Sequence, residues 1–365
     1  MEYSDRKKML KLFKSLSCLY VVLGLLVFMT GCPKTANKAQ PQGMVYYSFF
    51  DTVTYIYSYA GDSNEEFEAN CKAASKVLEN YHRLFDIYYE HSGVNNLCTV
   101  NKNAGGEAVK VDRELIDFLL YAKQLHETTD GEMNIMMGSV LKLWHDCRTQ
   151  AGEDPKNARI PTQEELTEAA AHTDLSLLEI DEAAGTVRIT DSAASIDVGA
   201  LGKGYATQKA AAHLKDLGLN SYVLNVGGNL CTIGTKPDGA GWATGVKDPA
   251  DPENFVLSIT LADTSCVTSG DYERFFTVEG ERYHHIIDKD TLLPARYYSA
   301  VTVITPDSAL ADALSTALFA MPYEDGVALV ESIGDVEVLW ITPDGTQYRT
   351  DGFSKLSPKD ISSDS

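Results

Sequence analysis

The 365-residue chain lacks the short motifs that most directly assign a chemistry to a sequence. None of its seven cysteines has CxxC spacing, and no cluster of Cys and His has the spacing of a zinc site. Neither the GxxxxGK[ST] phosphate loop nor the GxSxG nucleophile elbow is present. These absences exclude a zinc module, a P-loop nucleotide hydrolase and an α/β-hydrolase of the usual kinds.

Basic residues are scarce relative to acidic ones, with 31 Lys and Arg against 52 Asp and Glu and a formal net charge of −21. The N-terminal segment is itself basic, so the rest of the chain is more acidic still. Such a charge balance opposes binding to nucleic acid and to anionic lipid headgroups. We therefore expect no nucleic-acid partner.

One apolar run stands out, over residues 19–29, and only Tyr20 and Gly24 interrupt it. It follows several Lys and Arg residues, is too short for a confident membrane-spanning helix, and has the character of a secretory signal. The run ends in Thr30-Gly31-Cys32, and a Cys directly after small residues predicts a lipoprotein with a diacylglyceryl thioether on Cys32.

Met29 stands where Leu is usual in such signals. An uncleaved anchor and a soluble secreted protein are the alternatives, and all three interpretations put the rest of the chain outside the cytoplasm. The predicted organisation is a lipoprotein signal peptide (1–31), a flexible tether (32–43), one large domain (44–358) and a disordered tail (359–365). The predicted location is the extracytoplasmic face of the cell membrane, through the lipid anchor.

Five cysteines remain once Cys18 leaves with the signal and Cys32 carries lipid. Because an odd number cannot form a complete disulfide framework, most of them are predicted to be buried thiols.

The chain alternates predicted strands and helices without internal repeats. Amphipathic or helix-like patterns occur at 63–84, 113–128, 155–174, 205–217 and 308–321. Patterns typical of strands occur at 45–60, 178–181, 186–191, 222–226, 255–261, 299–305 and 336–341. This mixture predicts an α+β fold with a mostly antiparallel sheet.

The first candidate element for chemistry spans residues 195–205 (SIDVGALGKGY). A short strand is predicted to lead into three glycines and then into the helix over 205–217, which Gly218 ends. Glycines let a ligand approach the backbone, a helix N-terminus favours an anion, and Lys203 offers a cation. An ordinary strand-turn-helix corner is the alternative.

Two further elements follow. Residues 224–229 (LNVGGN) place a glycine pair at a strand end, which permits a close approach or a positive φ, although a tight turn explains it equally well. Residues 268–274 (TSGDYER) and the histidines His284 and His285 bring hydroxyls, carboxylates, an arginine and imidazoles close together in sequence. Histidine is the usual proton-transfer group near neutral pH, and a hydrogen-bonding role in the core or at the surface is the alternative.

The fourth element is 311–316 (ADALST) on a predicted helix, where Asp312 and Thr316 lie four residues apart and share one face. A carboxylate and a hydroxyl among small apolar residues suit Mg²⁺, which takes oxygen ligands beside substrate phosphates. The alternative is that Asp312 caps the helix N-terminus. Together the four elements predict a phosphate-bearing ligand, a bound Mg²⁺ and a proton shuttle.

These elements occur in the order found in the FAD:protein FMN transferases, the ApbE family of bacterial flavinyl transferases. The sequence resembles the family motifs D-x-G-[GA]-x-[GA]-K-G-Y, N-x-G-G, T-S-G-D-Y-x-R, H-I-I-D and A-D-[AG]-x-x-T at 197–205, 225–228, 268–274, 285–288 and 311–316. Similar upstream motifs occur at 50–52, at Tyr88 with Asn95 and Asn101, and at 129–144. The resemblance covers about residues 44–348, and members of the family are commonly lipoproteins.

The resemblance implies an ApbE-like, T-fold-related single large α+β domain, with a mixed, mostly antiparallel sheet and flanking helices. It also implies a Mg²⁺-dependent reaction in which FAD is split at its pyrophosphate. AMP leaves, and FMN is joined through phosphate to a Thr or Ser hydroxyl of an exported acceptor protein of a membrane redox system.

The resemblance assigns roles to individual residues. The metal is expected at Asp312, Thr316 and the backbone carbonyl of Ala200. His285, with Asp312, is expected to be catalytic, as the proton shuttle on the acceptor hydroxyl. The flavin nucleotide site is expected to be lined by Phe50, Tyr88, Glu132, Met133, Asn134, Asp197, Lys203 and Ile286.

The chain departs from the family pattern after His285. Lys289 and Leu292 stand where the family has Pro and Gly, so the turn is expected to differ, and Asn134 stands where many members have Asp. Two other functions stay open: an FAD pyrophosphatase that releases free FMN and AMP, and a lipoprotein that binds flavin without turnover. The retained metal set argues against the second of these.

Overall fold

The computed structural model describes residues 40–356. The predicted signal, the lipidation residue Cys32, most of the predicted tether and the predicted tail lie outside the described residues. The first strand begins at Gln42, two residues before the expected start of the domain.

The strands, in chain order, are β1 (Gln42–Phe49), β2 (Thr52–Ser58), β3 (Val109–Lys110), β4 (Leu178–Asp181), β5 (Thr186–Ile189), β6 (Ser221–Val226), β7 (Asn229–Gly234), β8 (Trp242–Lys247), β9 (Phe255–Leu261), β10 (Ser265–Gly270), β11 (Phe275–Val278), β12 (Glu281–His284), β13 (Ala300–Thr305), β14 (Glu337–Ile341) and β15 (Gln347–Arg349). The helices are α2 (Asn64–Phe85), α3 (Leu97–Lys102), α4 (Arg113–Thr128), α5 (Gly138–Glu153), α6 (Gln163–Ala170), α7 (Gly202–Asp216), α8 (Ser308–Phe319), α9 (Tyr323–Ile333) and α10 (Asp351–Leu356).

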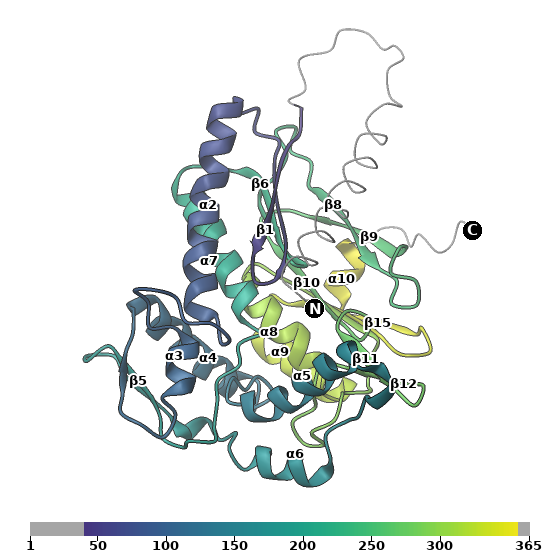
Figure 1. The fold of residues 1–365 in the computed structure, drawn as a ribbon. Coiled ribbons are helices and arrows are strands. Elements are labelled where there is room, and N and C mark those ends of the chain that lie inside the picture. Colours follow the sequence, from purple (N-terminus) through teal and green to yellow (C-terminus); the bar gives the residue numbers. More distant parts are fainter. Residues whose placement is uncertain (1–39, 357–365) are drawn as a thin grey trace. The chain divides into compact units, whose positions relative to one another are not determined.

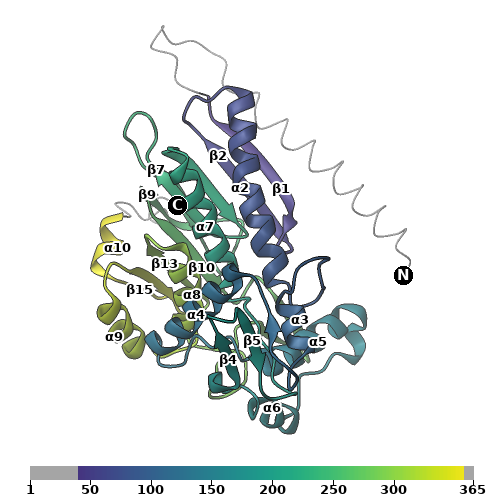
Figure 2. The ribbon, with the colours of Figure 1, turned by 90° about the vertical axis from the view of Figure 1, so that its left-hand side faces the viewer.

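An eight-stranded sheet in the order β1-β2-β6-β7-β10-β13-β14-β15 forms the centre of the fold. Each neighbouring pair in this sheet is antiparallel. Helices α2, α7 and α8 lie against one of its faces (Figures 1 and 2). The prediction of a single α+β domain with a mostly antiparallel sheet is therefore confirmed.

The middle of the sheet is covered on both faces. On β13, Val301 and Val303 join an apolar cluster with α8, whereas Ala300 and Ile304 join a second cluster that contains residues of β8, β9 and α10. Successive residues of a strand point to opposite faces, so a strand enclosed on both sides has no polar face. Every residue of β13 is buried, in agreement with this position.

The single strand predicted over 45–60 is a hairpin, so that part of the prediction was wrong. β1 and β2 are joined by a two-residue turn at Phe50 and Asp51, whose φ angles are 51° and 50°. Two-residue hairpin turns with both φ angles positive are usually recognised in a sequence by Asn-Gly or Asp-Gly. Because Phe-Asp carries no such signal, the sequence pattern alone did not reveal the turn.

The two most regular helix predictions are confirmed in α2 and α4. Ser63 caps α2 through a capping box with Glu66, and α4 covers the whole predicted range. The helix-like stretch at 155–174 contains only one turn of 3-10 helix and the short α6. None of the helices between residues 40 and 356 has the length and apolarity needed to cross a bilayer.

The cysteine prediction is also confirmed for the part of the chain that the structure describes. Its five cysteines are buried and form no disulfide: Cys71, Cys98, Cys147, Cys231 and Cys266.

Candidate active site

The site is built around the contact between α7 and α8. Helix α7 begins at Gly202, so Lys203 and Gly204 belong to its first turn and do not precede the helix as predicted. A Cβ atom on Gly204 would lie 2.4 Å from Cβ of Asp312 and 2.4 Å from the carbonyl oxygen of Ser308. Glycine is therefore required at this position because α8 passes too close for any side chain.

Asp312 lies inside α8 and does not cap it, so the helix-cap alternative was wrong. The cap is Asp307, whose side chain accepts from the amides of Ala309 and Leu310. Asp312 Oδ2 accepts a hydrogen bond of 2.8 Å from the amide of Gly204, and Lys203 Nζ lies 3.6 Å from the same oxygen. Burial raises the pKa of the Asp312 carboxyl, and the Lys203 ammonium opposes that rise.

A row of hydroxyl groups continues from Asp312 along α8. Thr316 Oγ1 donates to the Asp312 carbonyl at 3.4 Å, and Ser269 Oγ on β10 lies 3.4 Å from Thr316 Oγ1 and 2.9 Å from Ser315 Oγ. The expected metal ligands Asp312 and Thr316 thus share one face of α8. Ala200, the third, lies two residues before α7 begins.

These three residues fit a hard cation by the chemistry of their donors. A buried carboxylate, a hydroxyl and a backbone carbonyl all offer oxygen, which Mg²⁺ prefers. Among residues 40–356 no group of three or more His, Cys, Asp and Glu side chains has a metal-binding arrangement. A cation at Asp312 would therefore depend on the hydroxyl, the carbonyl and substrate oxygens for its remaining ligands.

The segment before α7 carries the second carboxylate of the site. Asp197 Oδ1 accepts from the amide of Gly199 at 2.8 Å, and burial raises the pKa of Asp197. Asn101 on α3 fixes the preceding residue, because its side chain donates to the Ile196 carbonyl at 2.9 Å and accepts from the Ile196 amide at 2.8 Å. This pair of bonds holds the segment that carries Asp197 against α3.

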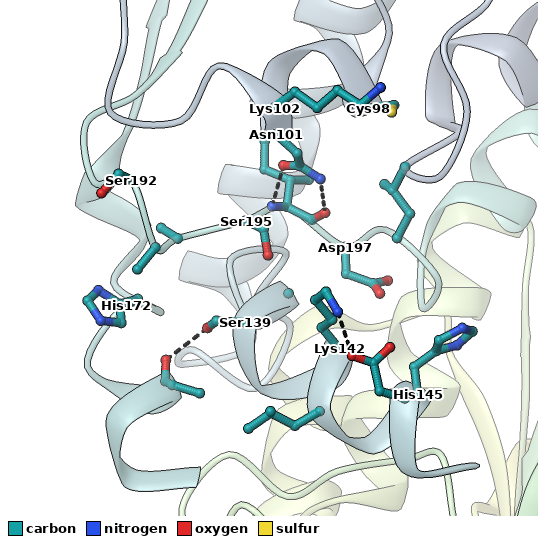
Figure 3. A pocket seen from close by; sticks show the side chains of 18 of the residues that line it. Cys98, Asn101, Lys102, Ser139, Lys142, His145, His172, Ser192, Ser195 and Asp197 are labelled. Carbon is teal, nitrogen blue, oxygen red and sulfur yellow. Dashed lines mark hydrogen bonds and ion pairs between the residues drawn. The ribbon is translucent and has the colours of Figure 1, made fainter. Parts of the chain in front are cut away.

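A cavity of about 740 Å³ opens beside Asp197. Figure 3 shows Asp197 and His145 at one end of it, and His172 and Ser192 at the other. Tyr88 also lines the cavity, with its ring 5.4 Å from that of His145. The expected flavin-site residues Tyr88 and Asp197 thus border one hollow.

Two arginines complete the charge pattern. Arg148 Nη2 lies 3.1 Å from His145 Nδ1. Burial lowers the pKa of Arg148. The charge of Arg274, in the loop between β10 and β11, lowers the pKa of Arg148 further, whereas Tyr88 and Asp197 oppose that effect. Sequence reasoning missed Arg148 and His145, and the available signal was that Arg148 follows Trp144 of the L-W motif by one helical turn on α5.

His285 lies directly after β12 and faces these positive groups. Burial and then the charge of Arg274 lower the pKa of His285 to about 3, with further contributions from Arg148 and Lys203. Its Nδ1 atom is buried and has no hydrogen-bond partner among the described residues. A neutral imidazole with a free ring nitrogen can accept a proton, as a general base must.

The expected flavin-site residues 132–134 lie between α4 and α5. Lys289 Nζ lies 3.2 Å from Glu132 Oε1, and burial raises the pKa of Glu132 while Lys289 opposes the rise. Met133 is buried. Asn134 uses its amide within the protein, donating to the Thr173 carbonyl and accepting from the Met136 amide, both at 2.9 Å.

Ile286, expected at the flavin site, is buried, and the turn that departs from the family pattern follows it. Leu292, which stands where the family has Gly, has φ of 61°, in the left-handed region that Gly favours. Asp288 Oδ1 accepts from the amides of Asp290 and Thr291, and the Leu292 carbonyl accepts from Trp144 Nε1 at 3.0 Å. These contacts hold a left-handed leucine in place.

Comparison with known proteins agrees with the resemblance seen in the motifs. Residues 50–340 match the ApbE family. The FAD:protein FMN transferase of Treponema pallidum (strain Nichols) is 30% identical over 348 residues, which cover 90% of this chain and 92% of that protein. The FAD:protein FMN transferase of Vibrio cholerae is 26% identical over 344 residues, or 93% of this chain and 98% of that protein.

Solved structures show the same likeness. The ApbE protein of Thermotoga maritima has a TM-score of 0.76 and 29% sequence identity, covering 88% of this chain and all (100%) of that chain. The flavinyl transferase ApbE of Pseudomonas stutzeri has a TM-score of 0.73 at 24% identity, covering 90% and 100% of the two chains, and this supports the fold.

Proposed function

The chain belongs to the ApbE family, and on that premise we propose that it transfers FMN from FAD to a Thr or Ser hydroxyl of an exported protein. The observation that carries the proposal is the junction of α7 and α8, where Lys203 Nζ lies 3.6 Å from the buried Asp312 carboxylate. A pyrophosphate needs positive charge and oriented donors around it, and this junction with Arg148 and Arg274 offers both.

In the proposed reaction, the acceptor oxygen attacks the phosphorus on the FMN side of the FAD pyrophosphate. The new O–P bond forms as the bond from that phosphorus to the bridging oxygen breaks, and AMP leaves with the bridging oxygen. The hydroxyl proton passes to a base, and we assign that role to His285, whose buried Nδ1 atom has no hydrogen-bond partner among the described residues.

The other residues of this chain bind and orient. Lys203 and the two arginines face the negative oxygens, and Tyr88 and Asp197 border the cavity that takes part of the dinucleotide. Asp312, Thr316 and the Ala200 carbonyl would hold Mg²⁺, which when bound supplies positive charge at the pyrophosphate and orients the attacked phosphorus. Transfer of this kind depends chiefly on position and electrostatics.

The test is incubation of the purified chain with FAD, Mg²⁺ and an extract of extracytoplasmic proteins. The expected result is a fluorescent flavin band that survives denaturing electrophoresis, with AMP released in equal amount. Free FMN and AMP without any labelled protein would instead indicate a pyrophosphatase. FAD that stays intact would indicate a binding protein and contradict the proposal.

We also propose that the chain acts outside the cytoplasm, held to the membrane by lipid on Cys32. The support is the order of the N-terminal residues: a basic stretch, a short apolar run and small residues before the cysteine. An enzyme held there meets acceptor proteins that are themselves exported to membrane redox systems.

A further inference from the structure

The tip of the β1–β2 hairpin has a backbone that its residues do not favour. Phe50 and Asp51 have φ of 51° and 50°, in the left-handed region where a side chain crowds the backbone. A two-residue hairpin turn with both φ angles positive normally takes Asn-Gly or another glycine-containing pair. A Phe-Asp pair in this conformation persists only when the surroundings hold it.

His82, near the C-terminal end of α2, stabilises the turn by contacting Phe50. Its Nδ1 atom accepts a hydrogen bond of 3.2 Å from the amide of Phe50, and the two rings meet edge to face with centroids 5.4 Å apart. The contact joins two elements that are 32 positions apart in the chain. Through this contact the turn is held directly against helix α2.

The turn lies within electrostatic range of Tyr88, a residue that borders the cavity. Phe50 is one of the residues expected to line the flavin site. Burial raises the pKa of Tyr88, and the carboxylate of Asp51 makes a smaller contribution in the same direction. A shift of the turn would therefore move Phe50 and the charge of Asp51 relative to Tyr88.

We propose that His82 is a positioning residue for FAD binding, which acts by holding the Phe50–Asp51 turn in its left-handed conformation. This inference rests on the proposed function, because it assigns the turn to the FAD site. His82 itself need not touch the nucleotide. The bond requires an unprotonated Nδ1 atom, so the proton of the neutral ring must sit on Nε2.

The surroundings of His82 favour that neutral form. Burial lowers the pKa of His82, and the carboxylates of Asp86, Asp51 and Glu79 oppose that effect, while His91 adds to it. The Asp86 carboxylate is also paired with another ring, because His91 Nε2 lies 2.9 Å from Asp86 Oδ2. Acidification that protonates His82 would place an N–H donor against the Phe50 amide and release the turn.

Two variants separate the hydrogen bond from the bulk of the ring. In His82→Asn, Oδ1 takes the position of Nδ1 and accepts from Phe50 but does not titrate. In His82→Phe, an aromatic ring is kept and the acceptor is lost. Affinity for FAD is measured by flavin fluorescence with the full chain between pH 5 and pH 8, and thermal unfolding is recorded for each variant.

We expect His82→Phe to weaken FAD binding about tenfold at pH 7.5, the effect of one lost hydrogen bond. We expect His82→Asn to bind within about twofold of wild type at pH 7.5 and to lose the decline in affinity that wild type shows in acid. Adding Asp51→Gly to His82→Phe should recover part of the affinity, because glycine adopts a positive φ without strain.

His91→Asn is the matched control, since it removes the neighbouring imidazole and keeps His82. It should retain the acid decline. The proposal is overturned if folded His82→Phe binds FAD as wild type does, or if the acid decline survives in His82→Asn and disappears in His91→Asn. Wild-type chain that binds FAD with this dependence but transfers no FMN would uphold the inference and contradict the proposed function. Absence of FAD binding by wild type would overturn both.

Discussion

The amide of Gly204 donates a hydrogen bond of 2.8 Å to Oδ2 of Asp312. The bond joins the first turn of α7 to the middle of α8, and it partly offsets the cost of burying a carboxylate. It also fixes the carboxylate beside Lys203, where the proposed function needs negative and positive charge close together. This close contact between α7 and α8 requires glycine at position 204, because any Cβ there would collide with α8.

Gly204→Ala should destabilise the fold. The new Cβ would lie 2.4 Å from Cβ of Asp312, so the two helices must separate. Overpacking of this kind typically costs about 1–3 kcal/mol in unfolding free energy, measured by chemical denaturation. Gly152→Ala is the matched control: it lies in α5 with no atom near its would-be Cβ and should stabilise by about 0.5–1 kcal/mol. Equal effects of the two changes would contradict the packing argument.

Asp312→Asn should separate function from stability. The Asn carbonyl can still accept from Gly204, so we expect an unfolding temperature no lower than that of wild type near neutral pH. The loss of negative charge should reduce FMN transfer more than about a hundredfold, as removal of a key electrostatic group does. Because burial raises the pKa of Asp312, wild type loses stability as pH rises through that pKa, and the variant should not. Transfer that survives in Asp312→Asn would refute the metal assignment.

Two histidines, the buried His284 and the half-buried His285, should make the fold sensitive to acid. Burial lowers the pKa of His284 to about 4 and that of His285 to about 3. The unfolded chain binds protons at these rings from about pH 6.5 downwards. Stability is therefore present above that pH and is lost as pH falls towards the folded pKa values.

Each of the two histidines should contribute a slope of up to about 1.4 kcal/mol per pH unit to the unfolding free energy below pH 6.5. Denaturation curves at pH 7, 6 and 5 measure it. His285→Gln should remove one of the two contributions, and an unchanged slope would show that His285 is not held neutral.

Lys289 should support the FAD site through Glu132. The two side chains are 3.2 Å apart, and Lys289→Glu would add a carboxylate next to Glu132, Asp288 and Asp290. We expect FAD affinity, measured by fluorescence titration, to fall about tenfold. The exchange Glu132→Lys with Lys289→Glu should restore part of it. Arg113→Glu, which breaks an exposed pair with Asp117, is the control and should leave FAD binding unchanged.

Cys32→Ala should release the protein from membranes. If Cys32 carries lipid, wild type partitions with the membrane fraction and is labelled by a fatty-acid probe. The variant should do neither, while an uncleaved apolar anchor would keep it in the membrane fraction. Immunoblots of fractionated cells with a fatty-acid label distinguish these outcomes.

The sequence by itself determined the features that depend on local chemistry. The capping box of Ser63 and Glu66 and the apolar spacing of α2 and α4 define helices through contacts only three or four residues apart. The order of the short motifs was enough to indicate the family, because each motif is a local string. The positive φ angles of Gly227 and Gly228 (56° and 94°) were likewise foreseeable from the residue type alone.

Only the tertiary structure decided which distant groups meet. Strands that are far apart in sequence are neighbours in the central sheet, and α8 lies against both β10 and α7. For this reason Asp312 meets Gly204 and does not cap its own helix. His82 likewise reaches Phe50, and Arg148 acts together with Arg274 on His285. No periodicity along the chain encodes such contacts, because they arise when helices and strands pack against one another and bury a common core.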